Sequence, residues 1–118
     1  MTKKEAIKLE NRCDKIMSGY LGKECTVSLA LSGKLKTEFN DGDFVTWNMT
    51  TNQVDYVRYI GFYNDLVETV AKIKECLDDN RDIFMNLVWS YSHRDELEER
   101  EYESRNQNVA IFRDKRSD

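Results

Sequence analysis

Three cysteines and a single histidine are the residues of this 118-residue chain that could hold a soft metal ion. Cys13, Cys25, Cys76 and His93 lie far apart in the sequence, and no cysteines have the C-x-x-C spacing typical of structural zinc sites. An odd number of separated cysteines is also not a disulfide framework. We therefore expect no metal, no cofactor and three mostly buried thiols, kept reduced in a cytoplasmic protein.

Acid–base and nucleophilic catalysis have few candidate residues here. Ser92 and His93 are adjacent, and neighbouring side chains of a strand point to opposite faces, so they form no dyad. Asp41 and Asp43 could bind a hard cation, but they flank a glycine, where aspartate favours a turn by itself. Gly33-Lys34 lacks the flanking residues of a phosphate-binding loop. The sequence thus predicts a protein that is not an enzyme and has no catalytic residue.

An acidic block lies between residues 95 and 103. Six of these nine residues are acidic and Arg100 is the one basic residue, so the carboxylates repel each other and must face water or a basic partner. Two interpretations are open: a solvated surface, or an electrostatic hook for a basic protein surface, in which carboxylates mimic nucleic-acid phosphates. We select five of them as candidate partner-binding residues: Glu96, Glu98, Glu99, Glu101 and Glu103.

Aromatic residues are a second feature that favours a partner. Apolar side chains between residues 54 and 62 fall on both faces of a predicted strand, which is more apolar surface than one core needs. Because Trp and Tyr often anchor protein interfaces, we add Trp47 and Tyr59 to the candidate partner-binding residues. The excess favours a protein partner or a homodimer.

The elements that must position these residues begin with a helix. Thr2 and Glu5 have capping-box spacing, and Gly19 and Gly22 mark the end of the helix. The pattern predicts an amphipathic helix packed on a sheet, with a self-association seam as the alternative. Its apolar residues recur every three or four positions: Ala6, Leu9, Cys13, Ile16 and Tyr20.

A meander of four antiparallel strands follows. Apolar and polar residues alternate with the period of a strand over residues 25–31, 35–39, 45–49 and 54–60. Turns are predicted at residues 32–33, 40–43 and 51–52, and we expect Asp41-Gly42 to form a type I′ turn.

The C-terminal half predicts a second helix and then an ambiguous segment. We expect Asn64 to cap the second helix and residues 78–80 to end it, with its apolar stripe packed on the sheet. Residues 82–105 fit either a strand over 82–91 followed by a short charged helix, or one helix. We favour the strand, because apolar residues alternate from Ile83 to Tyr91, and we expect a last short strand at 109–112.

These elements predict one α+β domain over residues 1–118: an N-terminal helix, an antiparallel β-meander, a second helix on the sheet, a further strand and a short charged helix. A helix followed by a bent meander resembles the Sm-like family in its order of elements over residues 4–60. The glycine-containing RNA-binding signature of that family is absent, so we transfer no residue role.

Composition narrows the functional classes. A net charge of −4 and a pI of about 5.1 argue against binding duplex nucleic acid, and no apolar run could span a membrane. We expect a small cytoplasmic protein that occupies a basic surface of a partner protein as an inhibitor or accessory factor, of the kind that phages and mobile elements encode. The alternatives are an oligomeric small-ligand or nucleotide binder, stacking its ligand on Trp47, Tyr56 or Trp89, and a sheet that binds single-stranded RNA.

Overall fold

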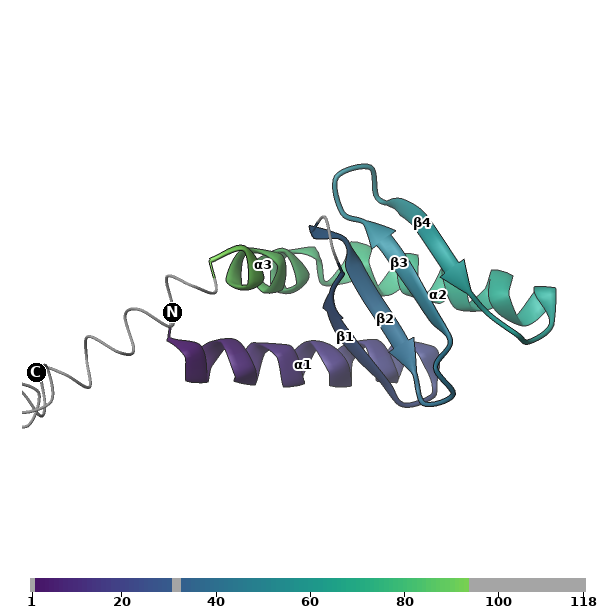
Figure 1. Ribbon diagram of the computed structural model, residues 1–118, viewed down its shortest axis with the longest axis horizontal. Coiled ribbons are helices and arrows are strands. Elements are labelled where there is room, and N and C mark those ends of the chain that lie inside the picture. The colour runs from purple at the N-terminus through teal and green to yellow at the C-terminus, as the bar shows by residue number, and fades with distance from the viewer. Residues whose placement is uncertain (1, 31–32, 94–118) are drawn as a thin grey trace, which may run out of the picture.

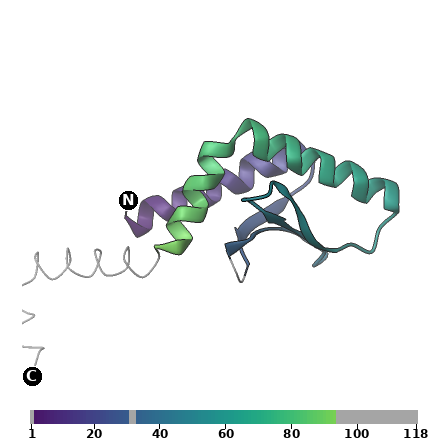
Figure 2. The same cartoon turned by 90° about the horizontal axis from the view of Figure 1, so that it is seen from above.

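The computed structural model describes residues 2–30 and 33–93. Four strands follow an N-terminal helix and form one antiparallel sheet in the order β1-β2-β3-β4. Helices α1 and α2 cover one face of the sheet, and α3 runs on beside α1 (Figures 1 and 2). The α+β class and the helix–meander–helix order are therefore confirmed. The elements are α1 (Lys3–Leu21), β1 (Cys25–Leu29), β2 (Leu35–Phe39), β3 (Phe44–Asn48), β4 (Gln53–Arg58), α2 (Tyr63–Asp79) and α3 (Arg81–Ser92).

Helix α1 is capped as its sequence predicts. The Glu5 amide donates to Thr2 Oγ1 at 3.2 Å, and Gly22 ends the helix in the left-handed conformation (φ 69°). The predicted stripe faces the rest of the chain rather than solvent. Of its members, Cys13 is buried, and Leu9, Ile16 and Tyr20 are partly buried against the core. Met17 and Leu21, which the stripe did not include, are buried on the same helix. This face packs against α2 and α3, so within one chain it is not a free seam.

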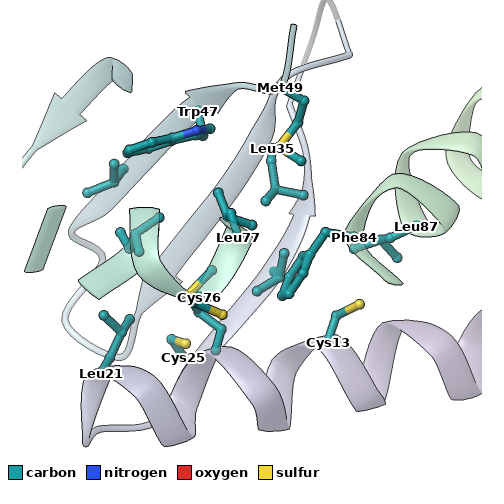
Figure 3. Close-up of a cluster of buried hydrophobic side chains, with 14 of the residues drawn as sticks. Cys13, Leu21, Cys25, Leu35, Trp47, Met49, Cys76, Leu77, Phe84 and Leu87 are labelled. Atoms are coloured by element: carbon teal, nitrogen blue, oxygen red, sulfur yellow. The ribbon is translucent and has the colours of Figure 1, made fainter. Parts of the chain in front are cut away.

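The core lies between the inner face of the sheet and the helices. Strand residues at alternate positions, such as Val27, Leu35 and Val45, are almost completely buried. Leu77 of α2 and Phe84 of α3 meet them from the helical layer (Figure 3). The strand alternation read from the sequence therefore identifies the inner face of β1, β2 and β3 correctly.

The hairpin between β2 and β3 forms where predicted, but the expected turn type is wrong. Within the described residues of this turn, Gly42 alone has a positive φ, at 88°, whereas a type I′ turn needs two such residues. The Phe39 carbonyl accepts from the Gly42 amide, and the Phe39 amide donates to the Asp43 carbonyl. The turn is thus a three-residue loop closed by a left-handed glycine.

Asp41 and Asp43 have the turn role that the sequence favours. Asp41 Oδ1 accepts from the Asp43 amide at 3.1 Å. Asp43 is buried, and its Oδ2 accepts from the Ile60 amide at 3.1 Å. The Asp43 carboxylate therefore ties this hairpin to the chain that follows β4. Asp41 Oδ1 and Asp43 Oδ2 both accept from backbone amides.

Helix α2 begins two residues earlier than predicted. Its N-cap is Phe62, which has an extended backbone and no side-chain capping bond, so the assignment of Asn64 as N-cap is wrong. The chain bends at Gly61 and α2 starts at Tyr63, which places Asn64 inside the first turn. The predicted end is correct: both the backbone amide and the side-chain amide of Asn80 donate to the Cys76 carbonyl.

The strand predicted over residues 82–91 is wrong, because the segment is helix α3. Phe84 and Leu87 are completely buried and face the other helices, whereas Met85 and Trp89 are both 40% exposed. A strand would have placed Met85, Leu87 and Trp89 on one face. The charged helix after residue 93 and the strand at 109–112 lie outside the described residues. Among the described helices, none is long and apolar enough to cross a bilayer.

Candidate functional site

The thiols and the imidazole, which could do chemistry, are occupied by structural contacts. Cys13, Cys25 and Cys76 are free and buried. Burial raises the pKa of the Cys13 and Cys76 thiols to about 12, which leaves them almost wholly protonated at neutral pH. The His93 ring stacks on Trp89 at 4.3 Å, and its Nδ1 lies 2.9 Å from the Trp89 carbonyl oxygen. Within the described part of the chain, no group of three His, Cys, Asp or Glu residues could hold a metal.

The burial of the thiols leads to a first prediction. In the folded protein at pH 8, a thiol-modifying reagent should react slowly with all three cysteines, and denaturant should make all three react rapidly. The measurement is the time course of thiol modification with and without denaturant. The unfolding temperature should not change with reductant or with a zinc chelator. A large fall with the chelator would contradict a purely structural role.

The β1 edge of the sheet is closed by side chains of α1. Asp14 Oδ1 accepts from the Val27 amide at 2.6 Å, and Ser18 Oγ accepts from the Cys25 amide at 3.1 Å. The Ser18 hydroxyl in turn donates to the Asp14 carbonyl at 2.7 Å. Partial burial raises the pKa of the Asp14 carboxyl, and the Val27 N–H opposes that rise. Two outward amides of this edge strand are thus unavailable to another strand.

The opposite edge is β4, and no helix or strand of the described residues pairs with its outer side. Five of its six residues are exposed. A bulge disturbs the register between Thr46 and Trp47 of β3, so that Trp47 pairs with Val54 and Thr46 with Tyr56. Asp55, the extra residue, forms an ion pair with Lys34 at 2.7 Å. The bulge blunts the first half of β4 and leaves residues 56–58 as regular edge.

The three most exposed large apolar side chains of the described residues follow this edge strand. We call Ile60, Phe62, Tyr63 and Val67 the β4–α2 surface; they are 81%, 82%, 77% and 49% exposed. They lie where the chain leaves β4 and begins α2, at the end of the molecule away from α3 (Figure 2). Asp65 and Glu68 are exposed on the same turns of α2. The arrangement is an apolar surface with acidic residues beside it.

The two aromatic residues selected from the sequence do not lie on this surface. Trp47 is only 2% exposed, and its indole N–H donates to Asn52 Oδ1 at 3.2 Å. Tyr59 is half-buried, with its ring against Gly61 and the Lys23 ammonium 5.6 Å from the ring centroid. Trp47 is therefore not available to a partner, and Tyr59 is available only in part. The five selected glutamates lie outside the described residues.

Sequence reasoning missed the β4–α2 surface, although the sequence carried a sign of it. Ile60, Phe62 and Tyr63 are large and apolar, but the latter two belong neither to the alternation of β4 nor to the stripe of α2. Apolar residues outside both periodic patterns have no place in the core. That mismatch, rather than the number of aromatic residues, is the informative feature.

The outer face of the sheet is relevant to the RNA-binding alternative. Phe44 and Tyr56 lie side by side, with ring centroids 5.8 Å apart. The Lys36 ammonium lies 4.5 Å from the Phe44 ring centroid and also pairs with Glu38 at 3.0 Å. One face of the Phe44 ring is therefore occupied by Lys36, which already pairs with Glu38. Tyr56 is left as the exposed residue of this pair on which a base could stack.

A cleft between one end of the sheet and α3 is relevant to the small-ligand alternative. It encloses about 380 Å³, and its charged lining residues are Lys34 and Arg81. Lys34 is paired with Asp55, and Arg81 donates to the Met49 carbonyl at 3.0 Å. Both cations thus have partners within the chain, and Trp47, Tyr56 and Trp89 do not line the cleft.

No family model, no curated protein and no solved structure matches this chain.

Proposed function

We propose that this chain is a non-enzymatic intracellular binding protein that acts by occupying the surface of a partner protein through the β4–α2 surface. The observation that carries the proposal is the exposure of Ile60, Phe62 and Tyr63, three consecutive large apolar side chains apart from one glycine. Single exposed apolar residues are ordinary, but a contiguous group is typical of an interaction site. Removing these side chains from water in a complex is favourable in free energy, so they can stabilise the binding of a partner.

The acidic side chains favour a partner with basic residues around its apolar contact. Asp65 and Glu68 lie on the α2 turns that carry Tyr63 and Val67, although Glu68 also pairs with Lys72 at 3.1 Å. The acidic block at residues 95–103 adds six carboxylates to the chain. Complementary charge speeds encounter and selects partners, whereas the buried apolar residues supply most of the affinity. This division suits an inhibitor or an accessory factor.

The test is a comparison of matched variants. Changing Phe62 and Tyr63 together to serine should abolish retention of the partner from a lysate of the native host. It should also weaken binding of the purified partner by a factor of about 100 or more, because central aromatic residues each contribute about 2 kcal/mol. Ile7→Ser is the control, since Ile7 is a half-exposed apolar residue on α1, outside this surface.

Three outcomes would contradict this proposal. The first is a partner that binds the double variant and wild type equally. The second is equal loss with Ile7→Ser, which would indicate unspecific apolar adsorption. The third is an eluate that holds RNA or a small molecule instead of a protein. The double variant should unfold like wild type because both side chains are exposed, so lost binding would not reflect lost folding.

The acidic block gives a prediction of its own. Changing Glu96, Glu98, Glu99 and Glu101 to glutamine should lower the association rate with the partner and weaken its salt dependence, without lowering stability. Exposed charges are screened over about 8 Å at physiological ionic strength, so the wild-type rate should fall between low and moderate salt. Stopped-flow mixing at two salt concentrations measures this. Equal rates for both proteins would leave the block as a solvated surface.

A further inference from the structure

The two edges of the sheet differ in a way that concerns assembly. On β1, side chains of α1 occupy the amides of Cys25 and Val27. On β4, the outward backbone groups of residues 56–58 have no such partner among the described residues, and the flanking side chains are exposed. An open edge is a template for another strand, and proteins usually block edges that are not used. The described residues thus block the β1 edge and leave the β4 edge available.

We propose that two copies of this chain pair antiparallel along β4, across a two-fold axis at Val57, so that their sheets become continuous. An antiparallel edge strand can pair with its own copy because a two-fold axis perpendicular to the sheet reverses its direction. A second copy of the chain can therefore supply the strand that β4 lacks. The proposal does not depend on the β4–α2 surface, which uses other side chains.

The position of the axis follows from the faces of β4 and their charges. Opposed residues of an antiparallel pair point to the same face, so the axis must pass through a residue rather than between two. With Val57 on the axis, it faces its own copy on the inner side, and Tyr56 faces Arg58 of the other copy on the outer side. That contact places a guanidinium beside an aromatic ring, and the symmetry repeats it.

The neighbouring axis positions are less favourable. With Arg58 on the axis, two guanidinium groups would oppose each other, which is destabilising. With Tyr56 on the axis, Val57 would oppose Asp55, which lies in the bulge and is already paired with Lys34. With the axis at Val57, Tyr56 lies opposite Arg58 of the other copy and no like charges oppose each other.

Two substitutions at one exposed position test the axis. Tyr56 is 61% exposed on the outer face, so a charge there should leave the fold intact. Tyr56→Glu would face Arg58 of the other copy with opposite charge and should preserve the dimer. Tyr56→Lys would face it with like charge, twice across the axis, and should raise the dimer dissociation constant about tenfold. Analytical ultracentrifugation over a micromolar concentration series measures both, beside Phe62→Ser/Tyr63→Ser, which should dimerise like wild type.

Cross-linking provides an independent test. Val57→Cys should form an intermolecular disulfide, because opposed Cα atoms in an antiparallel pair lie about 4.5–5.5 Å apart, within disulfide range. Thr26→Cys is the control, since Thr26 is exposed on the closed β1 edge. The native thiols are buried and should not interfere. Three results would overturn the proposal. Wild type could be monomeric, the dimer could be insensitive to the sign of the charge at residue 56, or both cysteine variants could cross-link equally.

Discussion

Replacing Phe84 with alanine is expected to lower the free energy of unfolding by about 3–5 kcal/mol, the range for a buried phenylalanine that leaves a cavity. Phe84 is completely buried. Figure 3 shows its ring pointing from the start of α3 into the core, toward side chains of α1 and α2. Removing the ring would therefore loosen α3 from two helices at once. Chemical denaturation followed by circular dichroism gives the difference.

Met85→Ala is the matched control for Phe84→Ala. Met85 is the next residue and is 40% exposed, so its truncation should cost much less than that of Phe84. A strand over residues 82–91 would give the reverse order, because Met85 would then share the buried face with Leu87. The pair of variants thus distinguishes the helix from the strand in solution. Equal losses would contradict the packing of α3 described above.

Replacing Asp14 with alanine is expected to lower the free energy of unfolding by about 1–3 kcal/mol, the cost of leaving a buried backbone amide without a partner. The Val27 N–H loses its acceptor in this variant, because it points away from β2 toward α1. Asp14→Asn is the matched variant, since its side-chain oxygen still accepts from Val27. Urea denaturation at neutral pH should therefore separate the two variants clearly. Equal losses would contradict a capping role for Asp14.

The comparison with Asp14→Asn also predicts a pH dependence. Partial burial raises the pKa of the Asp14 carboxyl in the folded state, so the folded chain binds this proton more tightly than the unfolded chain does. This tighter proton binding adds to the free energy of unfolding of wild type at acid pH, and the contribution is lost as the pH rises through the pKa of the folded state. Asp14→Asn is uncharged throughout and should be at least as stable as wild type at neutral pH. The stabilities should converge as the pH falls toward about 4, the pKa of an unfolded aspartate.

The sequence by itself determined the order and type of the elements from α1 to α2, apart from the type of the turn at residues 40–43 and the start of α2. Thr2, Gly22 and Asn80 mark helix ends because their side chains or their backbone freedom satisfy terminal hydrogen bonds locally. The alternation in β1 to β3 identifies the buried face because successive strand residues point to opposite sides. Such features depend on neighbours along the chain, so no tertiary contact is needed to read them.

Residues 82–92 and the candidate site were decided by tertiary structure alone. Apolar residues at 83–85 and 87–89 fit a period of two as well as a helical face, and only packing against α1 and α2 buries Phe84 and Leu87 together. Similarly, the mismatch of Phe62 with both periodic patterns indicates that it lies outside the core, but no local pattern tells that 82% of it remains exposed. That depends on where α2 comes to rest over the sheet, because burial is a property of contacts between segments distant in sequence.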